Sequence, residues 1–496
     1  MTSKFIKLAV LFASAVTVFP VLGFAAARTD LVLGIALEPP HLDPTAGAAA
    51  AIDEVTYANI FEGLTRITES GEVVPDLADS WTISPDGLTY TFKLHTGVKF
   101  HDGADFSAED VKFSIDRAMA ADSVNAQKAL FDGITAVAIV DPATVTITLS
   151  RPIGGLLYNL GWGDAVIVDA ASAATNKEKP IGTGPFKFDN WAKGSAVTLV
   201  KNPNYWGTAA MLDKVQFRII ADPAAATAAL LSGDVQAFPN FPAPEAVPQF
   251  SSDARFTVVI GQTEGETILS TNNKKPPFDN LKVRQAIAHA IDRKAIIDGA
   301  MFGQGTPIYT HFPPFNPAYV DLSATYPYDP AKAKALLVEA GFPNGFKATL
   351  KLPPVTYARR GGEIIAAQMR EIGIELEIIP IEWAQWIEQV FTNKDYDLTI
   401  VSHTEPNDIN IYGRKDYYFQ YDSPAFDAVM AKLDITTEPA QRNALLGEAQ
   451  KIISVDAVNG YLFQLAQTGI HDAKIMGLWD NAPIQAIDLT TVHWME

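Results

Sequence analysis

Residues 73–117 read VVPDLADSWTISPDGLTYTFKLHTGVKFHDGADFSAEDVKFSIDR. Between positions 89 and 94, threonine and lysine alternate with tyrosine, phenylalanine and leucine, which is the period of a strand with one buried face. The preceding SPDG supplies a tight turn with glycine where positive φ is tolerated, so the stretch predicts an antiparallel sheet. Ser107 stands three residues before Asp110, close to a capping box, and predicts the start of a helix.

The two halves of the chain differ in their patterns. In the first half, ITAVAIVDPATVTITLS (134–150) predicts a hairpin around DPAT. In the second half, NLKVRQAIAHAIDRKAIIDGAM (280–301) predicts one strong amphipathic helix. The segments KATLKLP, GGEIIAAQMREIGI, IELEIIPIE and YDLTIVSH then alternate strand, helix, strand and strand. This order predicts βαβ units and a partly parallel sheet after a β-rich first half.

Composition narrows the class of protein. The chain has 496 residues, is 48% hydrophobic and carries a formal net charge of -19, which suits a globular protein of about three domains. This negative charge repels nucleic acid and anionic lipid. The absence of cysteine excludes disulfides, thiolate metal sites, a cysteine nucleophile and a lipid-anchored cysteine.

The first 27 residues have the pattern of a secretory signal. Lys4 and Lys7 precede an apolar run from Leu8 to Phe24, and Ala25 and Ala27 form a small-x-small cleavage pattern. We expect cleavage after Ala27 and export to the periplasm without a lipid anchor. A single membrane anchor is the rival interpretation, but the proline and glycine in this segment and its cleavage pattern argue against it.

The sequence offers little for catalysis, phosphate binding or metal binding. GTGPF (182–186) lacks both the Lys-Ser or Lys-Thr of a Walker loop and a following helix. His95 and His101 flank a turn and are interpreted as surface residues. His403, with Glu405 and Asp408, is the only tight cluster of histidine and acid, and we expect no metal there. With no nucleophile motif either, we predict a protein that is not an enzyme and has no cofactor.

Aromatic residues gather in the second half. IEWAQWIEQVF carries Trp383 and Trp386, and YGRKDYYFQY begins with Tyr412. Core packing is the default explanation of these side chains. Tyrosines near Glu405 and Asp408, in a loop after a strand, also fit a polar ligand pocket with stacking walls.

Several long motifs in register carry a resemblance. The stretch 73–117 is similar to the most diagnostic segment of the family 5 bacterial extracellular solute-binding proteins, the peptide, nickel and opine receptors of ABC importers. PIGTGPFKF, LVKNPNYWG, LLSGDVQAF, FDNLKVRQAIAHAIDRKAII and YDPAKAKALLVEAGF match further blocks of this family in the same order. The resemblance covers essentially the whole chain after the signal.

The resemblance implies an α/β fold with two lobes, of the type II, cluster C-like periplasmic binding proteins, with an inserted domain and two hinge strands. Domain I is expected at 28–56, 182–268 and 468–496, domain II at 57–181, and domain III at 269–467. The hinges are expected near LSTNN (269–273) and FQLAQT (463–468), and GTGPF becomes a structural crossover between the first two domains. Solute would lie between domains I and III and favour closure, which the membrane permease reads.

The resemblance also suggests where the solute is held. In relatives the loop after the first strand faces the cleft, which implies Glu38 and His41. Aligning the family on EP places Ser402 at an aspartate that binds the amino group of peptides, and Arg359 lies near the place of an arginine that binds their carboxylate. The predicted ligand-binding residues are Glu38, His41, Tyr357, Arg359, Trp383, Trp386, Ser402, His403, Thr404, Glu405, Asp408 and Tyr412.

Both charged groups that would bind a peptide are therefore absent or moved. An unpaired buried ammonium costs several kcal/mol, so a sugar-like, opine-like or other polar solute is favoured over peptides. A generic di- or oligopeptide receptor remains the alternative, because a shift in register would let Glu405 or Asp408 bind the amine. An exported hydrolase is the competing class, and a chemotaxis or chaperone role could be added to transport. The expected partners are a small ligand and the permease, with no nucleic acid, and the expected state is a monomer.

Overall fold

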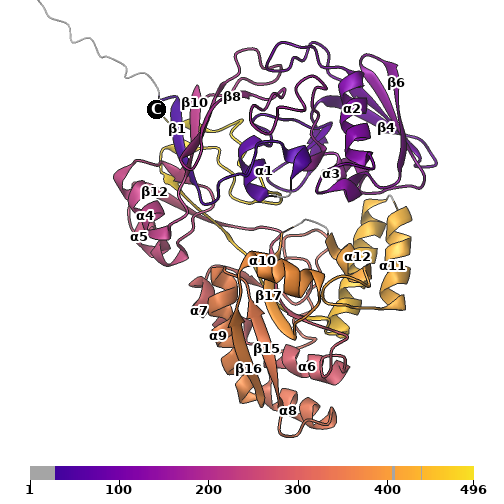
Figure 1. Cartoon of the computed structure of the whole chain (residues 1–496), viewed down its shortest axis with the longest axis vertical. Helices are drawn as coiled ribbons and strands as arrows, with labels where there is room; N and C mark the ends of the chain where they lie inside the picture. The colour runs from indigo at the N-terminus through magenta and orange to yellow at the C-terminus, as the bar shows by residue number, and fades with distance from the viewer. Residues whose placement is uncertain (1–27, 48, 405–407, 437, 496) are drawn as a thin grey trace, which may run out of the picture.

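The structure is a computed structural model that describes residues 28–47, 49–404, 408–436 and 438–495. Two lobes lie one above the other, and two chain crossings connect them (Figure 1). The predicted signal (1–27) and Glu405 lie outside the described residues. Among the helices described, none combines the length and the apolar character that a membrane span needs.

The first lobe is built on a seven-stranded mixed sheet. Its central strand β1 (Asp30–Ile35) runs parallel to its neighbours β10 (Lys214–Ile219) and β11 (Ala237–Phe238). The order of the sheet is β12 (Phe256–Gly261), β19 (Gln467–Asp472), β11, β1, β10, β9 (Ala196–Lys201) and β8 (Phe186–Ala192). Helices α4 (Pro223–Ser232) and α5 (Val247–Ser251) lie at its β12 end (Figure 1).

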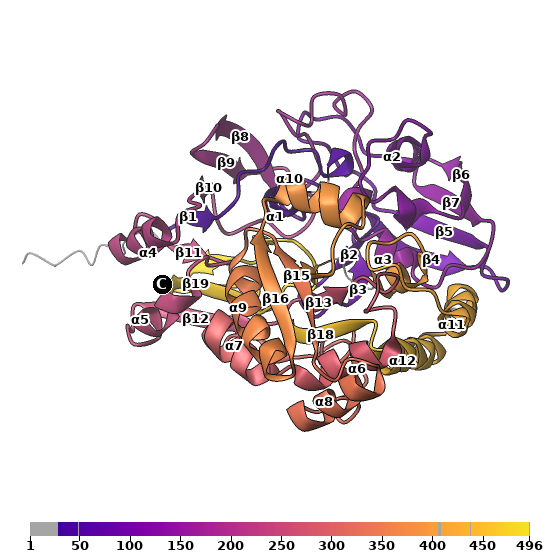
Figure 2. The same ribbon diagram turned by 60° about the horizontal axis from the view of Figure 1, so that its bottom comes forward.

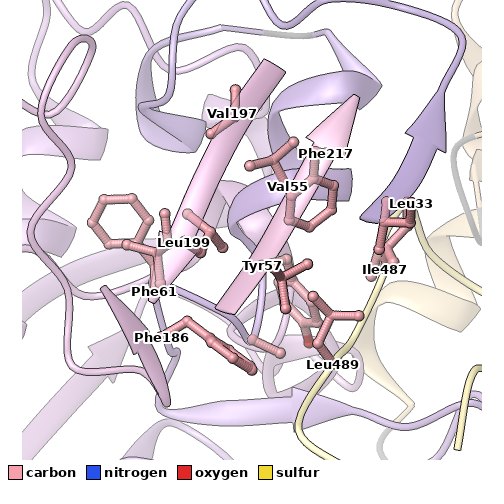
Figure 3. Close-up of a cluster of buried hydrophobic side chains, with 14 of the residues drawn as sticks. Leu33, Val55, Tyr57, Phe61, Phe186, Val197, Leu199, Phe217, Ile487 and Leu489 are labelled. Carbon is pink, nitrogen blue, oxygen red and sulfur yellow. The ribbon is translucent and has the colours of Figure 1, made fainter. Parts of the chain in front are cut away.

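The core of this lobe joins segments that are far apart in the sequence. Figure 3 shows Leu33 of β1 and Val55 of α1 (Ala50–Thr56) beside Phe217 of β10 and Ile487 near the carboxyl end. All of these side chains are nearly or fully buried. Burial of about 25 cal/mol per Å² of apolar surface makes this contact a main stabilising term for the lobe. The carboxyl-terminal segment is thus tied to the first lobe.

A four-stranded antiparallel sheet forms the outer part of the first lobe. It has the order β4 (Ala78–Ile83), β5 (Thr89–Leu94), β7 (Thr144–Leu149) and β6 (Ile134–Asp141). Both the predicted strand over 89–94 and the predicted 134–150 hairpin are confirmed. Helix α2 (Ala108–Met119) begins with the Ser107–Asp110 capping box, also as predicted. The short helix α3 (Leu156–Asn159) and the ribbon of β2 (Thr65–Ile67) and β3 (Val73–Pro75) complete this part.

The second lobe is built on a six-stranded mixed sheet (Figure 2). Its order is β14 (Thr306–Pro307), β18 (Asn459–Gln464), β13 (Glu266–Thr271), β17 (Leu398–His403), β15 (Phe346–Leu352) and β16 (Ile374–Pro380). Strand β15 runs parallel to β16 and β17, which confirms the predicted parallel character. The helices of this lobe are α6 (Leu281–Ala290), α7 (Arg293–Met301), α8 (Pro330–Glu339), α9 (Thr356–Glu371), α10 (Trp383–Trp386), α11 (Pro424–Ile435) and α12 (Pro439–Val455).

The prediction of one long helix over 280–301 is wrong. The segment forms α6 and α7, with a break at Ile291 and Asp292. The Asp292 side chain accepts a hydrogen bond from the backbone N–H of Ala295 and so caps the second helix. An aspartate inside an apolar periodic pattern competes with the helix in this way because its short side chain satisfies free backbone donors.

The chain passes between the two sheets at 262–265 and at 465–466. The second crossing lies within FQLAQT, where one hinge was predicted. The first lies before LSTNN, because Leu269, Ser270 and Thr271 already belong to β13 of the second lobe. Periodicity did not separate β12 from β13, since both are strands and the crossing between them is short. The division into three domains with the predicted boundaries stays a prediction.

GTGPF lies against the segment that follows α1. A Cβ on Gly182 would stand 2.0 Å from the carbonyl oxygen of Ile60, and one on Gly184 would stand 2.5 Å from that of Asn59. His101, interpreted as a surface residue, is half-buried and its ring lies against this loop. Its Nδ1 accepts from Gly182 N–H at 3.3 Å, and its Nε2 contacts the Gly184 carbonyl at 3.0 Å.

The stability of the protein is expected to fall in mild acid because of His101. Burial lowers the pKa of this imidazole to about 4, whereas an unfolded histidine titrates near 6.5. The stabilisation is therefore complete above pH 6.5 and is lost as the pH falls towards 4, and its size is about 3 kcal/mol. Urea unfolding at pH 7.5 and 4.5 should show a smaller loss for His101→Gln than for the unsubstituted protein. Equal losses in both proteins would contradict this assignment.

Candidate functional site

A pocket of about 190 Å³ lies beside the two crossings. Both lobes contribute to it, because Glu54 comes from α1 and Thr404 follows β17 of the second lobe. The lining consists of Ala50, Glu54, Pro239, Asn240, Thr263, Glu264, Gly265, Thr404, Leu465, Ala466, Gln467, Ala482, Ile484, Gln485, Ala486 and Ile487. Because every change in the angle between the lobes passes through these crossings, a solute held here would sense and favour one arrangement of the lobes.

The pocket combines two carboxyl groups with amides and small apolar side chains. Burial raises the pKa of Glu54 to about 7, although a hydrogen bond with Asn240 opposes the shift. Burial likewise raises the pKa of Glu264 to about 7, opposed by a hydrogen bond with Asn316. No lysine or arginine is among the described residues of the lining. The pocket is therefore built to accept hydrogen-bond donors and offers no fixed cation to an anionic group.

Two buried hydroxyl groups lie under the first crossing. Thr267 of β13 and Ser402 of β17 are direct cross-strand neighbours, and neither hydroxyl has a hydrogen-bond partner in the described part of the chain. The Ser402 Oγ would lie 3.3 Å from a Cβ on Gly265, which lines the pocket. The Ser402 backbone N–H donates to the Tyr357 hydroxyl at 3.2 Å. The predicted residues Ser402 and Tyr357 are thus brought together next to the pocket.

Thr404 is the predicted residue that lines the pocket itself. Its Oγ1 lies 3.1 Å from Nε2 of Gln485, which belongs to the carboxyl-terminal segment of the first lobe. This hydrogen bond joins the two lobes across the pocket. The lobes also meet where Gln304 contacts the Pro244 carbonyl and the Thr468 hydroxyl.

His403, Asp408 and Tyr412 lie on the other face of β17. The His403 Nε2 is 3.0 Å from the Tyr418 hydroxyl, and its Nδ1 is 3.7 Å from Asp408 Oδ2. Asp408 Oδ1 is 2.6 Å from Nε2 of His311, which in turn is 2.8 Å from Glu266 Oε1. Adjacent strand residues point to opposite faces, so Ser402 and His403, which the prediction grouped in one site, lie on opposite faces of β17.

Charge couples the groups on this second face. Burial alone would lower the pKa of His311, but Glu266 and Asp408 raise it to about 10. Burial would raise the pKa of Asp408, yet His311 brings it below its usual value. Burial raises the pKa of Glu266 well above its usual value despite the same imidazole. His311 and Glu266 were not predicted as site residues, because they lie far from Asp408 along the chain and share no motif with it.

The predicted aromatic walls are mostly core. Trp386 is buried and its Nε1 donates to Thr399 Oγ1 at 3.0 Å, while Tyr412 is buried against Phe419. Trp383 is 40% exposed and packs edge-on against Trp386. These tryptophans and Tyr412 do not belong to the pocket lining.

The remaining predicted residues are engaged elsewhere. The Arg359 guanidinium donates to the carbonyls of Pro353 and Ile381. Glu38 accepts from Trp191 Nε1 and from Gly194 N–H in the hairpin of β8 and β9. His41 Nδ1 accepts from the Asp43 backbone, and burial lowers the pKa of His41. The first lobe supplies Ala50 and Glu54 of α1 to the pocket instead of Glu38 and His41.

Comparisons with known proteins agree with this architecture. The family "Bacterial extracellular solute-binding proteins, family 5 Middle" matches residues 72–408. The glutathione-binding protein GsiB of Pectobacterium atrosepticum is 31% identical over 496 residues, which covers 95% of each chain. The heme-binding protein A of Haemophilus influenzae is 34% identical over 351 residues, which covers 64% of this chain and 63% of the relative.

Solved structures show the same fold. The periplasmic binding protein DppA of Helicobacter pylori, in complex with the peptide STSA, has a TM-score of 0.80 at 28% identity. The match covers 95% of this chain and 99% of the DppA chain. AgaA of A. tumefaciens R10, in complex with agropinic acid, has a TM-score of 0.80 at 26% identity and covers 94% and 99% of the two chains. The chain belongs to family 5 of the bacterial extracellular solute-binding proteins, the solute-capturing components of ABC importers.

Proposed function

We propose that the protein is a periplasmic receptor that captures a small polar solute between its two lobes and delivers it to the permease of an ABC importer. The proposal includes cleavage after Ala27, a freely diffusing monomer without a lipid anchor, and no chemical change of the solute. The observation that carries it is the pocket at the crossings, to which both lobes contribute and in which Gln485 and Thr404 join them.

The chemistry of the pocket supports a solute without a net negative charge. Glu54 and Glu264 accept hydrogen bonds from hydroxyl or amino groups, and the described lining offers no lysine or arginine to a carboxylate. A buried carboxylate without a cationic partner costs several kcal/mol. The small apolar side chains of the lining suit the carbon face of a sugar-like ring. An uncharged, hydroxyl-rich solute is therefore favoured over an opine that carries a carboxylate.

The arrangement around Ser402 argues against a generic peptide receptor. By the family resemblance, Ser402 takes the place of the aspartate that binds the amino group in peptide receptors. Thr267 beside it adds a second hydroxyl rather than a charge. Two donors of Arg359 already serve backbone carbonyls. A peptide would thus lose both of the ionic contacts that peptide receptors in the family use.

Native mass spectrometry of the mature protein from a bacterial periplasm tests this function. A single added mass that disappears on denaturation and matches a sugar-like compound is the expected result. A spread of peptide-sized masses would contradict the non-peptide proposal and favour the peptide receptor. A thermal-shift panel of sugars, dipeptides, glutathione and agropinic acid then identifies the class independently. Turnover of any of these compounds by the protein would contradict a pure binding role.

Replacement of Glu54 by lysine reports the charge of the solute. Glu54→Lys places an ammonium in the pocket, so binding of an uncharged or cationic solute should weaken at least tenfold. The measurement is isothermal titration with the solute identified by mass. Glu72→Lys, at an exposed position of the same lobe, makes the same change in net charge and should bind normally. Tighter binding by Glu54→Lys would show that the solute is anionic.

A further inference from the structure

Three side chains of the second lobe converge on one buried point. Glu266 comes from β13, His311 from the segment after β14, and Asp408 from the start of the 3-10 turn Asp408–Gly413. The His311 Nε2 is 2.8 Å from Glu266 Oε1 and 2.6 Å from Asp408 Oδ1. One donor atom from each residue lies within 4.8 Å of those of the other two.

An imidazole alone does not satisfy this arrangement. One ring N–H has one proton to donate, yet two carboxylate oxygens face the same nitrogen at short distance. Two ionised carboxylates and a neutral imidazole carry a charge of about -2, which buried surroundings do not tolerate without compensation. Either two protons or one divalent cation brings the cluster to neutrality.

The surroundings of the cluster suit a bound ion. The His311 side chain is 1% exposed and that of Asp408 is 13% exposed, so the site is shielded from solvent. The Tyr412 ring lies edge-on to the imidazole at 5.2 Å. His403 approaches the second oxygen of Asp408 at 3.7 Å, which places another nitrogen at the border of the cluster. Aromatic walls and a partner for the ligating carboxylate are features of the outer shell of metal sites.

We propose that Glu266, His311 and Asp408 bind one divalent transition-metal ion of the Zn²⁺ type. One nitrogen and two carboxylate oxygens form a donor set that zinc accepts, and three protein ligands leave one position open. Around a tetrahedral ion with bonds of about 2 Å, the donor atoms stand about 3.3 Å apart. The side chains therefore need to separate by less than about 1 Å to admit the ion.

This site adjoins the proposed solute pocket, because Glu264 of the pocket lining interacts electrostatically with His311, but the three proposed ligands do not line the pocket. Glu266 points to the opposite face of β13 from Thr267, whose hydroxyl lies beside Ser402. The ion would join three segments of the second lobe next to the first crossing. The fourth position would be filled by water or by the His403 imidazole.

The test is zinc binding by the mature protein after treatment with a chelator. Isothermal titration with Zn²⁺ at pH 7.5 should give one equivalent, with the release of about two protons, measured by comparing buffers of different ionisation heat. Substitution of Co²⁺ should give visible absorption bands of a four- or five-coordinate ion. Solute retention is measured on the same chelator-treated protein, so a failure of the metal proposal leaves the transport proposal to its own test.

Variants locate the ion. Asp408→Asn and His311→Gln should each lower the Zn²⁺ affinity at least 100-fold and remove the Co²⁺ bands. His289→Gln is the matched control, because His289 is also buried in the second lobe but its ring contacts the Pro327 carbonyl and the Tyr326 ring. Circular dichroism tests whether each variant is folded. If His311→Gln does not fold, the near-isosteric Asp408→Asn alone tests the metal site. No stoichiometric Zn²⁺ uptake, or uptake that both variants leave unchanged, would overturn the proposal and show that protons fill the site.

Discussion

Replacement of Gly154 by valine is expected to weaken solute binding at least tenfold, although Gly154 does not line the pocket. Gly154 lies just before α3 in the first lobe, and α3 lies opposite α11 and α12 of the second lobe (Figure 1). A Cβ at this position would stand 2.4 Å from Arg442 Nη1 and 2.5 Å from the Thr436 carbonyl oxygen. The lobes therefore touch here only because residue 154 has no side chain.

The clash cannot be relieved cheaply. The Arg442 guanidinium donates to the carbonyls of Leu433 and Thr436, so it is held in place by its own lobe. Valine would force the lobes apart and lower the fraction of protein in the closed arrangement. Apparent affinity falls in proportion to that fraction, and a tenfold loss corresponds to about 1.4 kcal/mol.

Isothermal titration with the solute identified by mass measures the loss, and small-angle X-ray scattering with saturating solute measures closure. Gly155→Ala is the control, because the nearest atoms to its Cβ are at 3.8 and 4.0 Å and need not move. Normal affinity and normal closure of Gly154→Val would show that this contact does not form in the solute-bound state.

Local patterns in the sequence predicted much of the fold. The hairpin of β6 and β7, the capped start of α2 and the parallel strands after residue 346 depend on neighbours in sequence, which a single chain displays directly. The break between α6 and α7 was missed because Asp292 fits the polar face of a continuous helix as well as it fits a cap. Periodicity does not distinguish these two uses of one aspartate.

The candidate site was harder to predict for the same reason. Ser402 and Thr404 were found because they follow a recognisable strand, and the structure places them next to and within the pocket. Glu54 and Glu264 were missed because no motif in their own segments marks them as ligand-binding, and only tertiary packing brings them to the pocket. Trp386 was predicted to form a wall of the ligand pocket, but it is buried and donates to Thr399. The local sequence does not distinguish a core tryptophan from one that stacks on a solute.

The conversion of Gly182 to alanine is expected to destabilise the protein by about 3 kcal/mol or more. The added Cβ would lie 2.0 Å from the Ile60 carbonyl oxygen and 2.9 Å from the Phe61 ring. Both atoms belong to a fully buried segment that also carries Glu62, so the backbone has no room to retreat. Overpacking of this kind ranks among the most costly single substitutions.

A hydrogen-bond network makes the cost larger than the clash alone. Glu62, only 2% exposed, accepts from the hydroxyls of Thr183 and Tyr205 at 2.6 Å each and from Trp206 Nε1 at 2.9 Å. A shift of residue 182 moves Thr183 and leaves the buried carboxyl short of a donor, which costs a further 1–3 kcal/mol or so.

The urea midpoint measures this loss at pH 7.5. Gly361→Ala in α9 is the matched control, since its nearest neighbours to a Cβ lie at 3.8 and 4.0 Å. Alanine stabilises a helix interior by up to about 1 kcal/mol relative to glycine, so the two alanine substitutions should shift the midpoint in opposite directions. Equal midpoints would mean that GTGPF does not pack against the 59–61 segment in the folded protein. Opposite shifts would establish that the glycines of this loop allow close contact with the backbone of the 59–61 segment. In a phosphate-binding loop, glycines of similar spacing allow close approach to a ligand instead.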